Sequence, residues 1–300
     1  MTMINRDTFS SCHPAVNFLY FALVLAFSMI FMHPVCLGVS LVCALAYNVY
    51  LNGRRAVRFN LLYMLPMFLV AALINPAFNH QGVTILLYLK SGNPLTLESV
   101  IYGIAAGVML VSVISWFACF NAIITSDKFI YLFGRVAPSM SLILSMTLRF
   151  IPRFKAQIKA VSDAQKCVGR DISSGSLIQR ARNGITILSI MVTWALENAI
   201  ETADSMKSRG YGLQGRTAFS IYRFDKRDLW ALLFLLICGT YIALGAILGG
   251  LRWHYFPTAG GVGLEPYPVS IFLVYFALCI SPVAINLLED RKWKALQSAT

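Results

Sequence analysis

Apolar residues fill six long stretches of the chain, and most polar residues lie between them. The stretches run Ala15 to Met32, Val35 to Leu51, Asn60 to Ile74, Ser99 to Ile123, Leu229 to Gly249 and Val269 to Leu287. Such lengths are typical of helices that cross the hydrocarbon of a membrane, which is about 30 Å thick. The pattern predicts an all-α polytopic membrane protein with about six transmembrane helices and a cytoplasmic domain of amphipathic helices.

Composition and charge agree with that class. The chain has 300 residues, of which 58% are hydrophobic and 13% charged, and its formal net charge is +12. Of its 25 Lys and Arg residues, 16 lie between Thr125 and Asp228. Basic residues kept on the cytoplasmic side produce such a total through topology alone, so nucleic acid is not an expected partner.

Loop charges predict the topology. The basic loop NGRRAVRF, from residue 52 to 59, and the block after Thr125 are expected in the cytoplasm, and both termini with them, in the plasma membrane. We expect three parts: a membrane domain at 1–124 with the first four spans, a coupling-helix domain at 125–227, and C-terminal spans with a short tail at 228–300. The first span is expected to be retained, not cleaved as a signal peptide.

One apolar segment inside the basic block is ambiguous. It runs from Pro138 to Ile151, after a short interfacial helix, DKFIYLFGRV. Crossing the membrane here would change the parity of the topology, so we expect the segment to lie at the inner face or to enter without crossing.

Two amphipathic helices follow. In the first, apolar residues recur at spacings of three and four from Phe154 to Val168. The second is expected from about Leu177 to Ser208, with an apolar face that includes Leu188, Met191 and Ala203. Each helix ends beside an Arg and a Gly.

These helix ends, Gly169-Arg170 and Arg209-Gly210, are the candidate functional elements. Glycine suits the left-handed residue that ends many helices, and a cation suits the negative end of the helix dipole. Arg209 is therefore either only a good helix-ending residue or a planar, always-charged fork displayed for an acidic groove.

At these residues the sequence resembles the transmembrane T component of energy-coupling factor (ECF) importers, which are ATP-driven uptake systems for vitamins and trace metals. The resemblance covers about a quarter of the chain. Its pieces are Arg149 to Pro152 (RFIP), Ala164-Gln165, Ala203, Ser208-Arg209-Gly210 and Arg216-Thr217.

The resemblance implies that two Ala-Arg-Gly-like helix tips dock into two ABC ATPase subunits and transmit their motion to a substrate-binding S component in the bilayer. The second tip is nearly standard, with Ser208 in place of Ala. The first reads Cys167-Val168-Gly169, with Val where Arg is expected. Either Arg170 or Lys166 supplies the charge from a shifted position, or the contact is weaker and its ATPase divergent.

Catalytic chemistry is not expected in this chain. Its seven cysteines are scattered singly, without metal-ligand spacing, and no GxxxxGK loop is present. We expect no catalytic residue, metal or cofactor, and Glu197, Glu201 and Asp204 are interpreted as a solvated helix face. The alternative function is a stand-alone secondary transporter or channel with a regulatory cytoplasmic loop. It would require buried charges or repeated broken spans, and neither is found.

Overall fold

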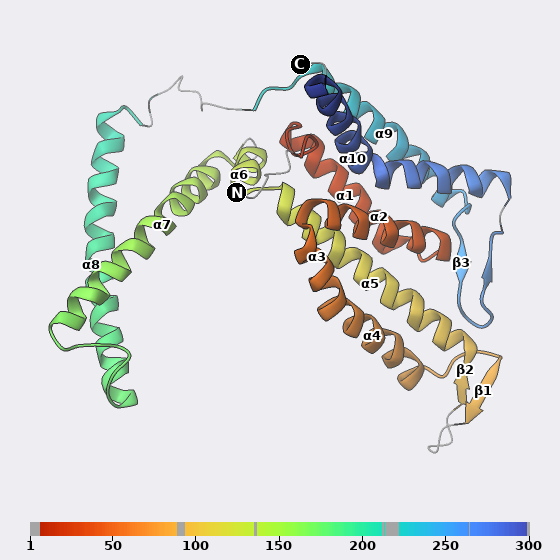
Figure 1. Cartoon of the computed structure of the whole chain (residues 1–300), viewed down its shortest axis with the longest axis horizontal. Helices are drawn as coiled ribbons and strands as arrows, with labels where there is room; N and C mark the ends of the chain where they lie inside the picture. The colour runs from red at the N-terminus through yellow and green to blue at the C-terminus, as the bar shows by residue number, and fades with distance from the viewer. Residues whose placement is uncertain are drawn as a thin grey trace. The chain divides into compact units, whose positions relative to one another are not determined.

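The computed structural model describes residues 7–88, 94–134, 137–211, 213, 222–263 and 265–298. The chain divides into two units. Unit 1 comprises Met1–Phe129 and Tyr222–Thr300, and unit 2 comprises Ile130–Ile221. The predicted all-α class is confirmed (Figure 1).

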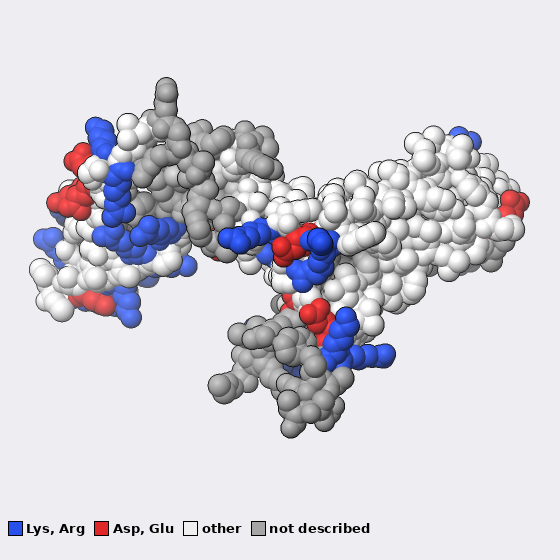
Figure 2. Space-filling view, turned by 90° about the horizontal axis from the view of Figure 1, so that it is seen from above, with Lys and Arg blue, Asp and Glu red and all other residues white. Residues whose placement is uncertain are grey.

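Unit 1 is built from long apolar helices. They are α1 (Pro14–Ile30), α2 (Pro34–Asn52), α3 (Arg54–Phe59), α4 (Leu65–Phe78), α5 (Leu97–Ile123), α9 (Lys226–Ile247) and α10 (Pro266–Ser298). In the described residues, five helical stretches are long and apolar enough to cross a membrane: α2, Arg54–Phe78, α5, α9 and Pro266–Lys292. The sixth predicted span is α1, which is apolar but has 17 residues. On the side that Figure 2 shows, the long flank of unit 1 is almost free of charge, and its charged side chains gather towards its ends.

The basic loop predicted after α2 is helical, which corrects the prediction. A single residue, Gly53 with φ +56°, separates α2 from α3, and helix then continues through the π-helical turn η1 (Asn60–Met64) into α4. Arginine and alanine are good helix formers, so RRAVRF extends the third span at its basic end. Two small hairpins join other helices: β1 (Ile85–Tyr88) with β2 (Pro94–Thr96), and β3 (Trp253–His254) with β4 (Gly260–Gly261).

Buried polar side chains hold the helices of unit 1 together. Trp116 Nε1 in α5 donates to Ser40 Oγ in α2 at 3.0 Å, and Ser40 Oγ lies 2.7 Å from Ser28 Oγ in α1. The Ser28 hydroxyl lies 3.2 Å from that of Tyr275 in α10. Between membrane helices such bonds add specificity where apolar burial cannot. One chain of hydroxyls thus fixes four helices.

The segment before α1 is also part of this core. Phe9 is 3% exposed, and its backbone N–H donates to Asn286 Oδ1 at 3.1 Å. Lys128, at the start of α6 (Ser126–Gly134), is 7% exposed and donates from Nζ to Ser10 O, Ser10 Oγ and Ile123 O. The last residues of unit 1 before the chain enters unit 2 are therefore tied to the first described residues.

Unit 2 consists mainly of two long helices, α7 (Pro138–Cys167) and α8 (Leu177–Ser208). The separate helices predicted before and after Pro152 are a single helix, which corrects the boundary at Ile151. Proline removes one backbone hydrogen bond, to the Leu148 carbonyl, and the helix continues because the residues around it favour helix. Among the described residues, α7 does not meet the length and hydropathy of a membrane span.

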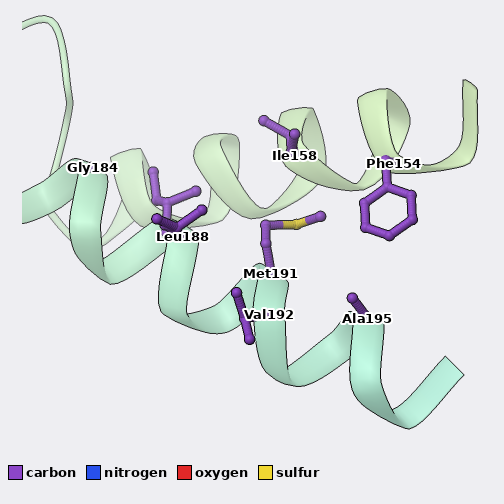
Figure 3. A pocket seen from close by; sticks show the side chains of 8 residues that line it. Phe154, Ile158, Gly184, Leu188, Met191, Val192 and Ala195 are labelled. Atoms are coloured by element: carbon purple, nitrogen blue, oxygen red, sulfur yellow. The ribbon is translucent and has the colours of Figure 1, made fainter. Parts of the chain in front are cut away.

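The two helices of unit 2 touch along a narrow line. Phe154 of α7 packs edge-to-face on Trp194 of α8 with 5.2 Å between ring centroids, and the guanidinium of Arg153 lies 5.6 Å above the same indole ring. Ile187 and Met191 are the buried residues of α8. Beside this line, side chains of both helices form an apolar groove of about 350 Å³ (Figure 3).

Candidate functional site

The first predicted tip is the end of α7, and it is a Schellman motif. The N–H of Gly169 donates to Lys166 O at 2.9 Å, and that of Arg170 donates to Gln165 O at 2.9 Å. Gly169 has φ +79°, the left-handed conformation that this motif requires at its glycine. Val168 is thereby placed at the C-cap, where it is 70% exposed.

The second tip, at the end of α8, has the same geometry. The N–H of Gly210 donates to Lys207 O at 2.9 Å, and that of Tyr211 donates to Met206 O at 3.0 Å. Gly210 has φ +73°, and Arg209 is the exposed C-cap residue. The glycine-capped ends predicted from the sequence are thus present in both helices.

Shared hydrogen bonds give the two tips an unambiguous register. Asp163, Lys166 and Gly169 of the first correspond to Asp204, Lys207 and Gly210 of the second, so both tips read D-x-x-K-x-x-G. In the first tip, the Asp163 and Lys166 side chains pair at 3.9 Å on the helix surface. This repeat is visible in the sequence, but it was not predicted from the charge pattern.

The first tip is braced against the start of α8. The Arg180 side chain donates from Nε to Ile172 O at 2.7 Å, and Asn183 Nδ2 donates to Asp171 O at 3.0 Å. Asp171 itself accepts from the N–H and hydroxyl of Ser173, and these bonds lower the pKa of its carboxyl. None of these bracing residues was predicted, because they lie up to 12 positions apart in sequence.

Of the residues predicted to support the tips, some lie beside a tip and others lie several helical turns away from it. Ala164 and Ala203 are exposed on the last turns of α7 and α8, and Gln165 supplies the carbonyl that closes the first cap. Arg149 and Pro152 lie near the middle of α7, about four turns before the tip. Arg216 lies outside the described residues.

Separation of the tips follows from the length of α8. The braces fix the first tip to the first turns of this helix, and the second tip is its C-terminal end. A helix of 32 residues is about 48 Å long at 1.5 Å per residue. The two tips are therefore separate contact points and cannot share one small groove on a partner.

Both α7 and α8 expose apolar side chains along their length. On α8, large apolar side chains that are 50–67% exposed recur at helical spacing: Ile185, Leu188, Val192, Leu196 and Ile200. On α7, Ile151 and Ile158 are 43% and 48% exposed. Lys and Arg side chains gather elsewhere on unit 2 (Figure 2). An exposed apolar face of this extent marks a surface for a membrane or another protein.

No cluster of three or more potential metal ligands is found among the described residues. Six of the seven cysteines are buried, and Cys167, at the first tip, is exposed. The tips thus combine exposed cations with hydrogen-bonded backbone caps, an arrangement suited to binding.

The chain is similar to known proteins over most of its length. A family model for cobalt transport proteins (CbiQ) matches residues 8–219. The chain is 34% identical over 99 residues to the energy-coupling factor transporter transmembrane protein EcfT of Lactobacillus helveticus, covering 33% of this chain and 36% of that protein. It is 34% identical over 121 residues to the protein of that name from Clostridium kluyveri, covering 40% and 43%. The alignments thus span about two-fifths of these relatives.

Proposed function

The chain belongs to the cobalt transport protein family, and we propose that it is the transmembrane coupling subunit of an ECF-type ABC importer. In this role it would carry the ATP-driven motion of two ATPase subunits to a substrate-binding S component that takes up a vitamin or trace metal. The observation that carries the proposal is the pair of equally built helix tips at the two ends of α8.

Each tip suits a docking contact. The Schellman bonds pair two of the last helix carbonyls of each tip, so a partner that covers the tip meets fewer unpaired acceptors. Ser208, Arg209 and Gly210 form the second contact, and Lys166, Gly169 and Arg170 contribute to the first. Two rigid points, one held near the start and one at the end of a helix about 48 Å long, suit two subunits.

The S component would use the apolar surfaces. The exposed faces of α7 and α8 and the apolar helices of unit 1 offer a bilayer-embedded partner a large surface without charge. We place the protein in the plasma membrane, with both termini and the segment 125–227 in the cytoplasm and with 1–124 and 228–300 forming the membrane part. Most of the basic residues then lie on one side.

ATP hydrolysis is assigned to other chains. The sequence has no GxxxxGK loop to hold the phosphates of a nucleotide. The central turns of the predicted spans also contain no Asp, Glu, Lys or Arg that a proton- or ion-coupled carrier would need. The subunit is accordingly proposed to be a non-enzymatic part of an ATP-driven complex.

An affinity purification tests the proposal. The tagged chain is isolated from its native membrane in mild detergent, as wild type, as Arg209→Glu, and as the matched control Lys155→Glu, which reverses an exposed charge near the middle of α7 and away from both tips. ATPase subunits and a small, very apolar membrane protein should co-elute with wild type and the control, and the ATPases should be depleted with Arg209→Glu. If the chain elutes alone in all three cases, the proposal fails and a stand-alone carrier takes its place.

A further inference from the structure

The two helix tips exchange the positions of their arginine and their apolar side chain. In the second tip the C-cap residue is Arg209, and the residue after the glycine is Tyr211. In the first tip the C-cap residue is Val168, and the residue after the glycine is Arg170. The hydrogen bonds of the two caps are the same, so this register does not depend on a choice of sequence alignment.

Lys166 does not compensate for the missing C-cap arginine. Its counterpart in the second tip is Lys207, one residue before Ser208, so both tips carry a lysine at this position. Lys166 is moreover paired with Asp163 in its own helix. The difference in charge between the tips therefore lies at the C-cap and at the position two residues beyond it.

These positions require different surfaces on the partner. Arg209 brings a guanidinium to the C-cap, where carboxylates can receive it through paired hydrogen bonds. Val168 brings an apolar side chain that is 70% exposed, and covering a carboxylate with it would remove water from that charge without replacing its hydrogen bonds. Conversely, an apolar surface suited to Val168 would leave the charge of Arg209 unpaired.

We propose that the two tips dock into two different ATPase chains whose sockets are chemically reciprocal. The socket for the second tip holds its carboxylates opposite the C-cap. The socket for the first tip is apolar opposite the C-cap and holds its carboxylate opposite the position after the glycine, where Arg170 lies. This inference rests on the proposed function, since it names the chemistry of the partners at the same tips.

The first tip carries a natural probe for this question. Cys167 immediately precedes Val168, is exposed, and corresponds to Ser208 in the second tip. A maleimide carrying a photoreactive benzophenone is attached to Cys167 in native membranes, and after illumination the cross-linked peptides are identified by mass. The matched variant, Cys167→Ser with Ser208→Cys, moves the same probe to the same position of the second tip, and Cys167→Ser alone is the blank.

Cross-links from Cys167 and from Ser208→Cys are expected on two ATPase chains of different sequence, with acidic residues opposite the C-cap at the second site and apolar residues at the first. Cross-links from both probes to the same peptide of one ATPase chain would overturn the inference and leave the proposed function standing. So would two different chains that both present carboxylates opposite the C-cap. If neither probe reaches an ATPase, the proposed function itself fails.

Discussion

The buried ammonium of Lys128 is expected to anchor the start of α6, where the chain leaves unit 1, and Lys128→Met tests this. Methionine keeps the apolar stem and removes three charge-assisted hydrogen bonds, to Ser10 O, Ser10 Oγ and Ile123 O. Such bonds contribute about 1.5–3 kcal/mol each, while burial of the ion costs several kcal/mol. That burial cost lowers the pKa of Lys128. Three such bonds contribute about 4.5–9 kcal/mol together, and a burial cost of about 3–6 kcal/mol offsets most of this, so the expected net loss is on the order of 2–3 kcal/mol.

The loss is measured by heating the purified chain in one detergent and following the monodisperse fraction. For a chain of this size the midpoint should fall by roughly 3–5 °C. The matched control is Lys226→Met, which removes an exposed ammonium at the start of α9 and should leave the midpoint within about one degree. Equal midpoints for the two variants would refute the anchoring role and show that Ser10 and Ile123 are satisfied without the lysine.

Three further outcomes are expected. In the folded protein a maleimide should label Cys167 with one equivalent and Cys167→Ser with none, because the other six cysteines are buried; labelling of Cys167→Ser would contradict this. Gly169→Ala and Gly210→Ala should each weaken their cap by roughly 1–2 kcal/mol, seen as faster amide exchange at the tip. The two losses should be similar, because the added Cβ at residue 210 would meet only Leu213 Cδ1, at 2.8 Å, and that side chain is 68% exposed and can turn away; exchange as slow as in the wild type would contradict the role of the left-handed glycine. Trp194→Ala removes the edge-to-face and cation–π contacts between α7 and α8 and should speed proteolysis within unit 2 but not unit 1; unchanged cleavage would mean that another contact holds the helices.

Helical spans were predictable from the sequence because twenty apolar residues have few other structures available in a bilayer. The errors occurred where a local signal was given too much weight. Arg54 and its neighbours were interpreted as a loop from their charge, although nothing in them opposes a helix once Gly53 has turned the chain. Pro152 was interpreted as a helix boundary, although one lost hydrogen bond in a 30-residue helix does not end it.

The caps of the candidate site were predictable for a similar reason. A Schellman motif is made within six residues, so a glycine after the last periodic position is a sufficient signal. The braces from Arg180 and Asn183 to the loop after the first tip were not predictable, because they depend on how α8 leaves that loop. The correspondence of Val168 with Arg209 was predicted from the glycine that follows each residue, and the equal hydrogen bonds of the two caps agree with it.

The stiffness of unit 2 comes from the continuity of its helices and not from a hydrophobic core between them. Between α7 and α8 the buried side chains of α8 are Ile187 and Met191, which is too little to fix two helices of 30 and 32 residues by packing. The backbone of α8 is uninterrupted, and the braces join the first tip to its start. A displacement at Arg209 would therefore pass along one helix to the first tip, while the apolar faces beside it stay free for a partner. A larger hydrophobic core between α7 and α8 would make unit 2 more stable by itself, but it would cover the surface that the proposed membrane partner needs.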